Sequence, residues 1–535
     1  MLTTSPDSLP NDTDALKALL LQRDQELQQL RATVSALQQA LSIRSLEIEQ
    51  LQLQINKLKR MQFGRKSEKL DRQIEQLETR LEDLIAEEGQ EHYQSKDGIS
   101  GNADQPVVRK SARRPLPDHL PREEHVLEPA EQSCPQCGGE LKPLGEDVSE
   151  QLEKIEAAFK VIRHVRKKKA CACCDCIVQA PAPSRPIERG IAGPGLLAHI
   201  AVSKFADHQP LYRQAVIDAR QGVELDRSIR ARWLGMGAAL IQPLVEALQR
   251  YVLAPGKIHT DDTPIPVLSP GHGQTKTGRL WVYVRDDRRS GSDAAPAAWF
   301  AYSPNRQGQH PQSHLAHFSG VLQADAFPGY NEIYAAGQVQ EAACMAHARR
   351  KIHDLHVKKA TPTTTEALRR IGALYAIEAQ IRGQAPDYRR RIRQEQALPL
   401  LQDFEQWLRT RLLTLSTQSD TTKAINYLLN QWRALLYYCE DGRAEIDNNL
   451  AENALRSVAL GRKNFMFLGA DSGGERAAAF YSLIVSARLN EIDPQAYLRH
   501  VFTYIADYPV NRVAELLPWN VAAKLTPAQT RAGLI

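Results

Sequence analysis

One stretch of fifty residues, 14–63, contains neither glycine nor proline and repeats apolar residues every seven positions. Such a heptad repeat favours a coiled coil, because polar and charged side chains fill the positions between the two seams. A long helix packed on its own protein is the alternative. We predict a leucine-zipper-like coiled coil that joins copies of the chain into a homo-oligomer. One seam runs through Leu20, Leu27, Val34, Leu41, Ile48 and Ile55, and the other through Arg23, Leu30, Leu37, Arg44, Leu51 and Leu58.

The 535 residues are too many for one ordinary domain, and roughly 150 residues per domain predicts three or four. Hydrophobic residues make up 42% and charged residues 24%, as in soluble proteins with sizeable cores. A net charge of +5 does not by itself indicate nucleic acid. The first residues lack a secretory pattern, and no apolar run approaches the ~18 residues of a membrane span. We therefore expect a cytoplasmic protein without membrane contact.

The composition changes several times along the chain and predicts a multidomain α+β protein. Short β-rich runs between Lys257 and Tyr330 read as four strands, and helical periodicity precedes and follows them. The expected parts are the coiled-coil helix (14–63), a linker (88–130), a zinc-ribbon-like module (131–182), a helical DNA-binding region (193–250), an α/β core (256–486) with a helical insertion at about 365–435, and a C-terminal helical tail (487–535).

Six of the eight cysteines lie between residues 134 and 176. Without an export signal this favours metal binding over disulfides. "CPQCGG" supplies Cys134 and Cys137, and two CxxC pairs can place four thiolates tetrahedrally around a structural Zn²⁺. In the second group, Cys171/Cys174 and Cys173/Cys176 both have the spacing, and we favour Cys171 and Cys174. Reduced thiols that bind no metal are the alternative.

A basic run, "RHVRKKK", enters the second cysteine group. Such a run is usually a solvated face, but beside a zinc ribbon a DNA phosphate-contacting surface is the better interpretation. The candidate contacts are Arg166, Lys167, Lys168 and Lys169.

Acidic residues mark the β-rich runs. Asp261 lies in the first run and Asp325 at the end of the fourth. Neighbours on a strand point to opposite faces, so only one of Asp261 and Asp262 can face a given site. Two strand carboxylates and a third on a helix can hold two Mg²⁺ ions. In "DNNLAENALR", Glu452 is either that third ligand or the partner of Asn449 in a helix capping box.

Together these motifs resemble the insertion sequence 66 family of bacterial DDE transposases, whose core has the ribonuclease-H-like fold. The resemblance runs through "FGRKSEKL", "CPQCGG", "VSKFADHQPLYRQ", "HTDDTPIPVL", "ADAFPGY", "CMAHARRKIHD", "DNNLAENALR" and "GRKNFMFLGADSGGERAAAFYSLI", and continues to "LLPWN". Where the family commonly has Glu this chain has Asp262, and where Arg is frequent it has Asn453. The first departure leaves the choice between Asp261 and Asp262 open.

The resemblance implies that Asp261, Asp325 and Glu452 form the DDE triad and bind Mg²⁺, with Mn²⁺ as a possible substitute. It also implies a zinc-binding DNA-recognition region and, as partners, the double-stranded ends of an element and its target, with accessory proteins of the element as further candidates. Arg349, Arg350 and Arg456 are candidate DNA contacts. A protein of this kind is nucleoid-associated when bound to DNA.

Two further motifs stay open. Cys344 and His347 have CxxH spacing, but a zinc pair there needs two more ligands that the sequence does not show. We interpret the motif as a structural or substrate-positioning element. "GADSGGERAA" either brings backbone N–H groups to a phosphate or is an ordinary turn.

The expected activity is Mg²⁺-dependent strand cleavage and strand transfer, with metal ions rather than a protein base activating the nucleophile. A DNA-binding regulator with an inactive core is the alternative from another class. A nuclease of the same fold that cuts branched DNA is a third. Metal-dependent nicking of DNA that carries the element's ends separates them.

Overall fold

The computed structural model describes residues 116–525 except 156–157, 175, 189 and 270–273, together with scattered residues between 14 and 84, of which 24–36 form the longest run. The chain divides into two units, Met1–Leu84 and Ile85–Ile535. In the first, residues 24–36 are helical, and Leu27, Leu30 and Val34 are 50%, 61% and 48% exposed. The helix agrees with the heptad pattern. Most of the remaining span 14–63, and linker residues 88–115, lie outside the described residues.

The second unit opens with a four-stranded sheet around one long antiparallel pair, β2 and β3. Strand β1 runs parallel to β3, although its residues fall in the predicted linker, so that prediction is wrong there. Charge explains the pairing: Glu124 on β1 meets Arg163 on β3 at 3.3 Å, and Glu123 pairs with Lys160. The strands are β1 (Arg122–Leu127), β2 (Leu141–Ile155), β3 (Ala158–Cys171) and β4 (Ile177–Gln179).

A five-stranded mixed sheet forms the centre of the second unit, in the order β7-β6-β5-β8-β9. Strand β5 pairs antiparallel with β6 and parallel with β8, so its position is central. The four predicted strands are present, and the sequence reading missed the four-residue β9. The strands are β5 (Gly256–Leu268), β6 (Thr275–Arg285), β7 (Ala297–Ser303), β8 (Gly320–Gln323) and β9 (Val339–Ala342).

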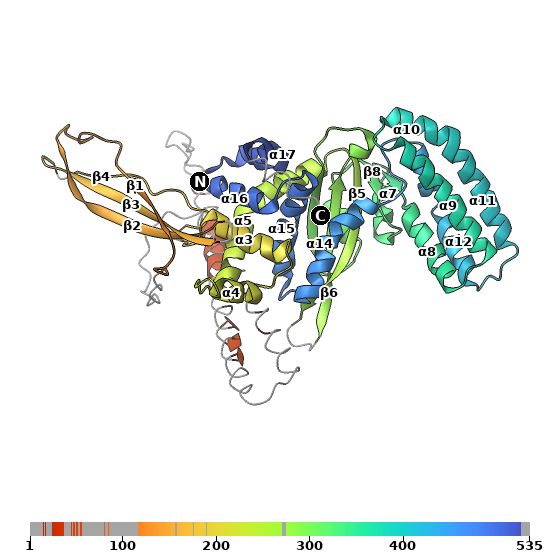
Figure 1. The fold of residues 1–535 in the computed structure, drawn as a ribbon, viewed down its shortest axis with the longest axis horizontal. Coiled ribbons are helices and arrows are strands. Elements are labelled where there is room, and N and C mark those ends of the chain that lie inside the picture. The colour runs from red at the N-terminus through yellow and green to blue at the C-terminus, as the bar shows by residue number, and fades with distance from the viewer. Residues whose placement is uncertain are drawn as a thin grey trace. The chain divides into compact units, whose positions relative to one another are not determined.

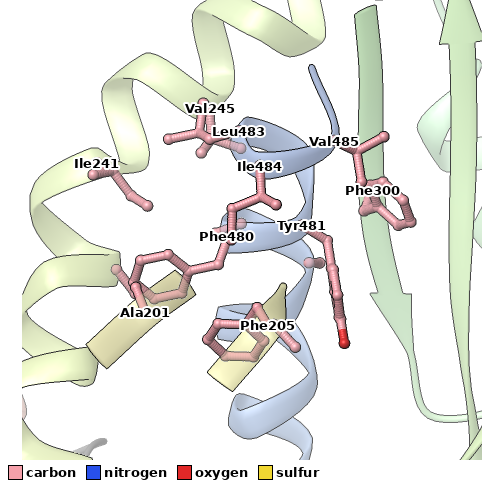
Figure 2. Packing of buried hydrophobic residues seen from close by; sticks show 14 of the residues in the cluster. Ala201, Phe205, Ile241, Val245, Phe300, Phe480, Tyr481, Leu483, Ile484 and Val485 are labelled. Atoms are coloured by element: carbon pink, nitrogen blue, oxygen red, sulfur yellow. The ribbon is translucent and has the colours of Figure 1, made fainter. Parts of the chain in front are cut away.

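Helices cover this sheet and share its hydrophobic core (Figure 1). Figure 2 shows α15 between α3, α5 and strand β7; the ring of Phe480 stacks on Phe205 at 5.1 Å between centroids. Among the described helices, none has the length and apolarity to cross a membrane. The helices are α3 (Pro194–Phe205), α4 (Leu211–Ala219), α5 (Arg227–Val252), α14 (Asn449–Phe465), α15 (Asp471–Leu489) and α16 (Pro494–Tyr504).

The shared core corrects two predicted boundaries. Helices α3 and α5 bury most of their residues against α15 and α16, so residues 193–250 do not form a module separate from 256–486. Helix α16, in the predicted tail 487–535, packs on α3 and belongs to the same core. Sequence periodicity reports which face of a helix is apolar, but not which partner covers it.

The predicted insertion at 365–435 is helical and has a hydrophobic core of its own. It begins earlier than expected, because α8 packs on α9 and α12 and contributes Ile352 to that core. The helices are α8 (Met345–Lys358), α9 (Pro362–Ile381), α10 (Pro386–Ile392), α11 (Leu398–Leu412), α12 (Asp420–Asn430) and α13 (Trp432–Leu436).

Buried ion pairs tie this insertion to the segment before α14. Arg393 donates two hydrogen bonds of 2.7 Å to Glu378 and one of 2.8 Å to the Tyr438 carbonyl. Arg389 lies 3.0 Å from Glu445, which leads toward α14. These charges are almost fully buried, so each depends on its partner.

Replacing Arg393 therefore tests whether this network stabilises the fold. Arg393→Met leaves Glu378 without its bidentate partner, and we expect the free energy of unfolding to fall by about 3–5 kcal/mol in denaturant titration. Arg390→Met, at an exposed position on the preceding helix α10, is the control and should stay within about 0.5 kcal/mol of wild type. Equal stability of the two variants would contradict the assignment.

Candidate active site and zinc centre

Four cysteines lie together at one end of the β2–β3 pair, where β2 begins and β3 ends. The Sγ atoms of Cys134 and Cys174 are 3.3 Å apart and those of Cys137 and Cys171 are 3.4 Å apart, and one group contains all four. Cys173 and Cys176, the alternative pair, are not part of this group. The distances are far too long for disulfides and suit thiolates around one ion. The cluster supports a structural zinc.

Local backbone explains why two glycines follow Cys137. Gly138 has φ of 72°, in the left-handed region that glycine adopts without strain. A Cβ atom at Gly139 would lie 2.8 Å from the Cys173 sulfur and 3.2 Å from that of Cys171. Against the opposing effect of burial, hydrogen bonds from the Cys137 and Gln136 backbone lower the pKa of Cys134 to about 6. A thiolate, the form that binds metal, is thereby favoured.

The basic run beside the cysteines is largely engaged in ion pairs. Lys167 lies 2.9 Å from Glu128, and Lys168 lies 2.7 Å from Asp147. Lys169 also reaches Glu128, at 3.5 Å, and Arg166 donates to the Ala180 carbonyl. Exposed pairs of this kind contribute about 1 kcal/mol or less, so the lysines can exchange a carboxylate for a phosphate. DNA contact by these residues stays a prediction.

The acidic cluster is centred on Asp261, on the central strand β5. Burial above all raises the pKa of Asp261 to about 7; the charges of Asp325, Asp262 and Glu452 act in the same direction, and the Asp262 N–H, which donates at 2.8 Å, acts against them. Asp325 follows β8, the parallel neighbour of β5, and its Oδ1 accepts from the Phe327 N–H at 3.1 Å. The negative charges of Asp325, Asp262 and Glu452 thus all act on Asp261, at an electrostatic cost that a bound cation would relieve.

Arginines separate the roles of Asp261 and Asp262. The Asp262 side chain is only 1% exposed and pairs with Arg279 at 2.9 Å and Arg306 at 2.8 Å. Arg306 also reaches Asp325, at 3.4 Å. Asp262 is therefore occupied by two guanidinium groups, whereas Asp261 accepts only a backbone N–H among the hydrogen bonds of the described residues. Arg306 had no signal in the sequence, because it lies in the loop after β7.

Glu452 does not cap its helix, so the capping-box alternative is wrong. The N-cap of α14 is Asn448 rather than Asn449, and its side chain makes no capping hydrogen bond. Glu452 instead accepts from Arg350 at 3.2 Å, and its Oε1 lies 3.6 Å from His347 Nε2. Its ligand atom groups closely with those of Cys344 and His347; among the described residues, Asp261, Asp325 and Glu452 do not form so tight a group.

Asn448 anchors the start of α14 to the central strand, a role that the sequence reading missed. Its side-chain oxygen lies 3.0 Å from His259 Nδ1, and its amide nitrogen donates to the Thr260 carbonyl at 2.8 Å. Its backbone N–H donates to the Cys344 sulfur at 3.1 Å. Burial lowers the pKa of His259 well below 6.5, so the ring is neutral and donates from Nδ1.

The start of α15, in "GADSGGERAA", holds an acid of the chain itself. Asp471 in the first turn accepts from Lys276 at 2.6 Å and from the Tyr302 hydroxyl. Gly474 is required by packing, since a Cβ atom there would lie 2.3 Å from the Tyr302 ring. The favourable interaction with the helix N-terminus is therefore already used by Asp471, which favours the ordinary turn over a phosphate site.

A four-cysteine zinc centre and a mixed sheet with clustered acids are features of metal-dependent proteins that act on nucleic acids. Family comparison specifies the class: residues 189–476 match the Transposase IS66 family, and the chain belongs to that family. Residues 131–175 match the zinc-finger binding domain of transposase IS66, and 482–519 the IS66 C-terminal element. Residues 50–124 match the element described as transposase C of IS166 homeodomain.

Relatives of similar length occur in Sinorhizobium fredii. The uncharacterized protein y4hP is 40% identical over 489 residues, which cover 88% of each chain. The uncharacterized protein y4qI is 35% identical over 531 residues, or 96% of this chain and 97% of its own. The similarity therefore extends across the sheet, the insertion and the zinc centre.

The electrostatic cost at Asp261 predicts a stabilising variant. The pKa of Asp261 is about 7 in the folded protein and near 3.9 in the unfolded chain. Between these pH values the folded state holds a proton that the unfolded chain has lost, so the free energy of unfolding falls as pH rises. In Mg²⁺-free buffer at pH 8 we expect Asp261→Asn to raise the melting temperature. The gain should shrink by up to about 1.4 kcal/mol per unit as pH falls below 7.

Asp262→Asn is the control for this experiment. Burial raises the pKa of Asp262 as well, against the effect of its two arginines. Because Asn removes the anion that Arg279 and Arg306 share and leaves both guanidinium groups without it, the melting temperature at pH 8 should fall. If Asp261→Asn is the more destabilising of the two variants, the assignment of the buried, unpaired carboxylate to Asp261 fails.

Zinc content tests the cysteine centre. Cys134→Ser removes one of four thiolates, and we expect bound zinc, measured by atomic emission, to fall by about one ion per chain. Cys173→Ser alters an exposed cysteine outside the group and should leave the zinc content unchanged. Loss of zinc in both Cys134→Ser and Cys173→Ser would instead assign Cys173 and Cys176 as the second pair of ligands.

Proposed function

We propose that this chain is a DNA transposase that binds the terminal inverted repeats of its element and catalyses Mg²⁺-dependent strand cleavage and strand transfer. The observation that carries the proposal is that Asp261, Asp325 and Glu452 lie close enough for their charges to interact. They come from β5, the end of β8 and α14, and the carboxylates of Asp325 and Glu452 both raise the pKa of Asp261. A mixed sheet with Asp261 on its central strand also supports a ribonuclease-H-like core.

The residues of the chain have distinct roles in this proposal. Asp261 and Asp325 hold Mg²⁺ from the sheet, and Glu452 completes the set from α14. Mg²⁺ bound by these residues would supply an activated water or 3′-hydroxyl as nucleophile and positive charge for the leaving oxygen. Asp262 is not a ligand; its two arginines keep positive charge beside the acids.

Basic side chains around the acids are positioned for a DNA backbone. Arg350 is 56% exposed and already reaches Glu452, so it lies at the border of the acidic site. Arg349 is exposed on the same helix, and Arg456 is exposed one turn after Glu452 on α14. We propose that these arginines bind phosphates near the cleaved bond, and that Arg166 and Lys167–Lys169 bind duplex further along.

The exposed seam at Leu27, Leu30 and Val34 supports self-association through the N-terminal helix. Apolar side chains at heptad spacing gain free energy when a second helix covers them. We propose a homo-oligomer that brings two element ends together.

The critical experiment is cleavage and joining of a labelled end fragment by Glu452→Gln. Gln keeps the shape and removes a charged oxygen ligand, so strand transfer should fall by at least about 10²-fold in Mg²⁺, as for a group that acts in the transition state. Melting temperature and end binding should stay close to wild type. Asp325→Asn should behave alike, and partial rescue by Mn²⁺ is an additional supporting result.

Parallel reactions with Ca²⁺ or without added divalent cation establish the metal requirement. Normal cutting and joining by Glu452→Gln would reject the triad. Specific end binding by the wild type without nicking would identify a regulator, and cleavage of branched DNA regardless of end sequence would identify a nuclease of the same fold.

A further inference from the structure

A second mixed-ligand cluster lies where the insertion meets α14. Cys344 is the N-cap of α8, His347 lies in the first turn of α8, and Glu452 lies near the start of α14. One ligand atom from each lies within 4.8 Å of the others. The first two residues have CxxH spacing, and the third is 105 positions after His347. The fold thus supplies a ligand that no local motif could show.

Two polar atoms of this cluster are buried without a hydrogen-bond partner. Within the described part of the chain, neither Glu452 Oε1 nor His347 Nδ1 has one. The 3.6 Å between Glu452 Oε1 and His347 Nε2 is too long for a hydrogen bond. Burying a polar atom unpaired costs about 1–3 kcal/mol, more for a charged group, so Glu452 Oε1 points to a missing partner; an ion bound through His347 Nε2 would leave Nδ1 outside the ligand set.

The separation suits two ligands of one metal ion. Two ligand atoms each about 2.1 Å from a tetrahedral ion lie about 3.4 Å apart. A thiolate, an imidazole and a carboxylate form a borderline-soft set, which favours Zn²⁺ or a similar transition metal over Mg²⁺, a cation that prefers oxygen ligands. With three protein ligands, a fourth position stays open to water or substrate.

Hydrogen bonds outside the three ligands hold two of them in place. The Asn448 backbone N–H donates to the Cys344 sulfur at 3.1 Å, and Arg350 donates to the other oxygen of Glu452. Partners of this kind orient ligands and tune metal affinity. Cys344 is only 2% exposed, so its sulfur is shielded from competing thiols.

From this geometry we propose that Cys344, His347 and Glu452 bind one Zn²⁺-class ion, separate from the four-cysteine centre. The ion joins α8 of the insertion to α14 and orients the Glu452 carboxylate. The inference does not rest on the proposed strand chemistry, because a protein that never cuts DNA would bind the ion equally well. On the side that faces the insertion, Glu452 would thus bind a Zn²⁺-class ion.

Metal counting on the full-length chain tests the proposal. After exposure to Zn²⁺ and removal of the excess without chelator, the wild type should retain two zinc ions per chain. Cys344→Ser and His347→Ala should each retain one, and so should Cys134→Ser, which alters the other centre. Cys439→Ser is the matched control: it is also 2% exposed and free but lies outside the cluster, so this variant should retain two.

Co²⁺ in place of Zn²⁺ identifies the ligand sulfur. In the Cys134→Ser/Cys137→Ser protein, we expect the thiolate-to-cobalt charge-transfer band of one cysteine, and its loss when Cys344→Ser is added. His347→Ala, at a partly exposed position, gives a second readout if Cys344→Ser fails to fold.

One zinc ion in the wild type, or full zinc content in both Cys344→Ser and His347→Ala, would overturn the proposal. Neither result bears on strand transfer, which Asp325→Asn tests through activity in Mg²⁺ without altering a ligand of this site. A chain that binds two zinc ions but never cuts DNA would contradict the proposed function and leave this site intact.

Discussion

The geometry of the acidic site depends on the hydrogen bonds that the side chain and backbone of Asn448 make to β5 and to the start of α8. One amide side chain binds His259 and the Thr260 carbonyl on β5, and the backbone N–H of the same residue binds Cys344 at the start of α8. Three elements far apart in the sequence are thereby fixed next to Asp261. Since Asn448 is fully buried, each lost hydrogen bond would leave an unpaired polar group in the core. Such a penalty favours one arrangement of α14 over all others.

Burying the acidic side chains is unfavourable, and the fold supplies counter-charges to some of them but not to all. Asp262 is neutralised by Arg279 and Arg306, and Arg306 extends the pairing to Asp325. Asp261 has no such counter-charge in the described chain, and burial raises its pKa to about 7. A fold selected only for stability would not keep a buried, unpaired carboxylate in the middle of its sheet. The difference in charge pairing between Asp261 and Asp262 is consistent with the proposal that Asp261 binds a cation.

How far the sequence could predict this structure depends on the range of the determining contacts. CxxC spacing predicted Cys134 and Cys137 but left two possible pairs in the second group, and short β-rich runs predicted four of the five strands in the central sheet. Strand β9 has only four residues and carried too little pattern. Strand β1 lies in a polar, Pro-rich stretch that is typical of a linker, and the residues that pair with its Glu side chains, Lys160 and Arg163, are distant in the sequence.

The same reason explains the errors at the site. A capping box at Asn449 and Glu452 satisfied local spacing, but the helix starts one residue earlier than that box requires and Glu452 binds side chains of α8. Arg306 and Asn448 bind partners that lie at distant sequence positions, so no local motif identifies them. Residues that carry chemistry were recognisable by type, whereas residues that position them were not.

The insertion is tied to the core, because one of its buried charged residues pairs with the segment that leads into α14. Arg389 pairs with Glu445, and the Glu445 backbone N–H donates to Gln323 at the end of β8, at 2.9 Å. The Met345 N–H at the start of α8 binds the Ile446 carbonyl, also at 2.9 Å. Asp325 follows that end of β8 by two residues, and Glu452 follows Ile446 by six. A shift of the insertion must therefore move the supports of both acids, which makes it a mechanical part of the acidic site.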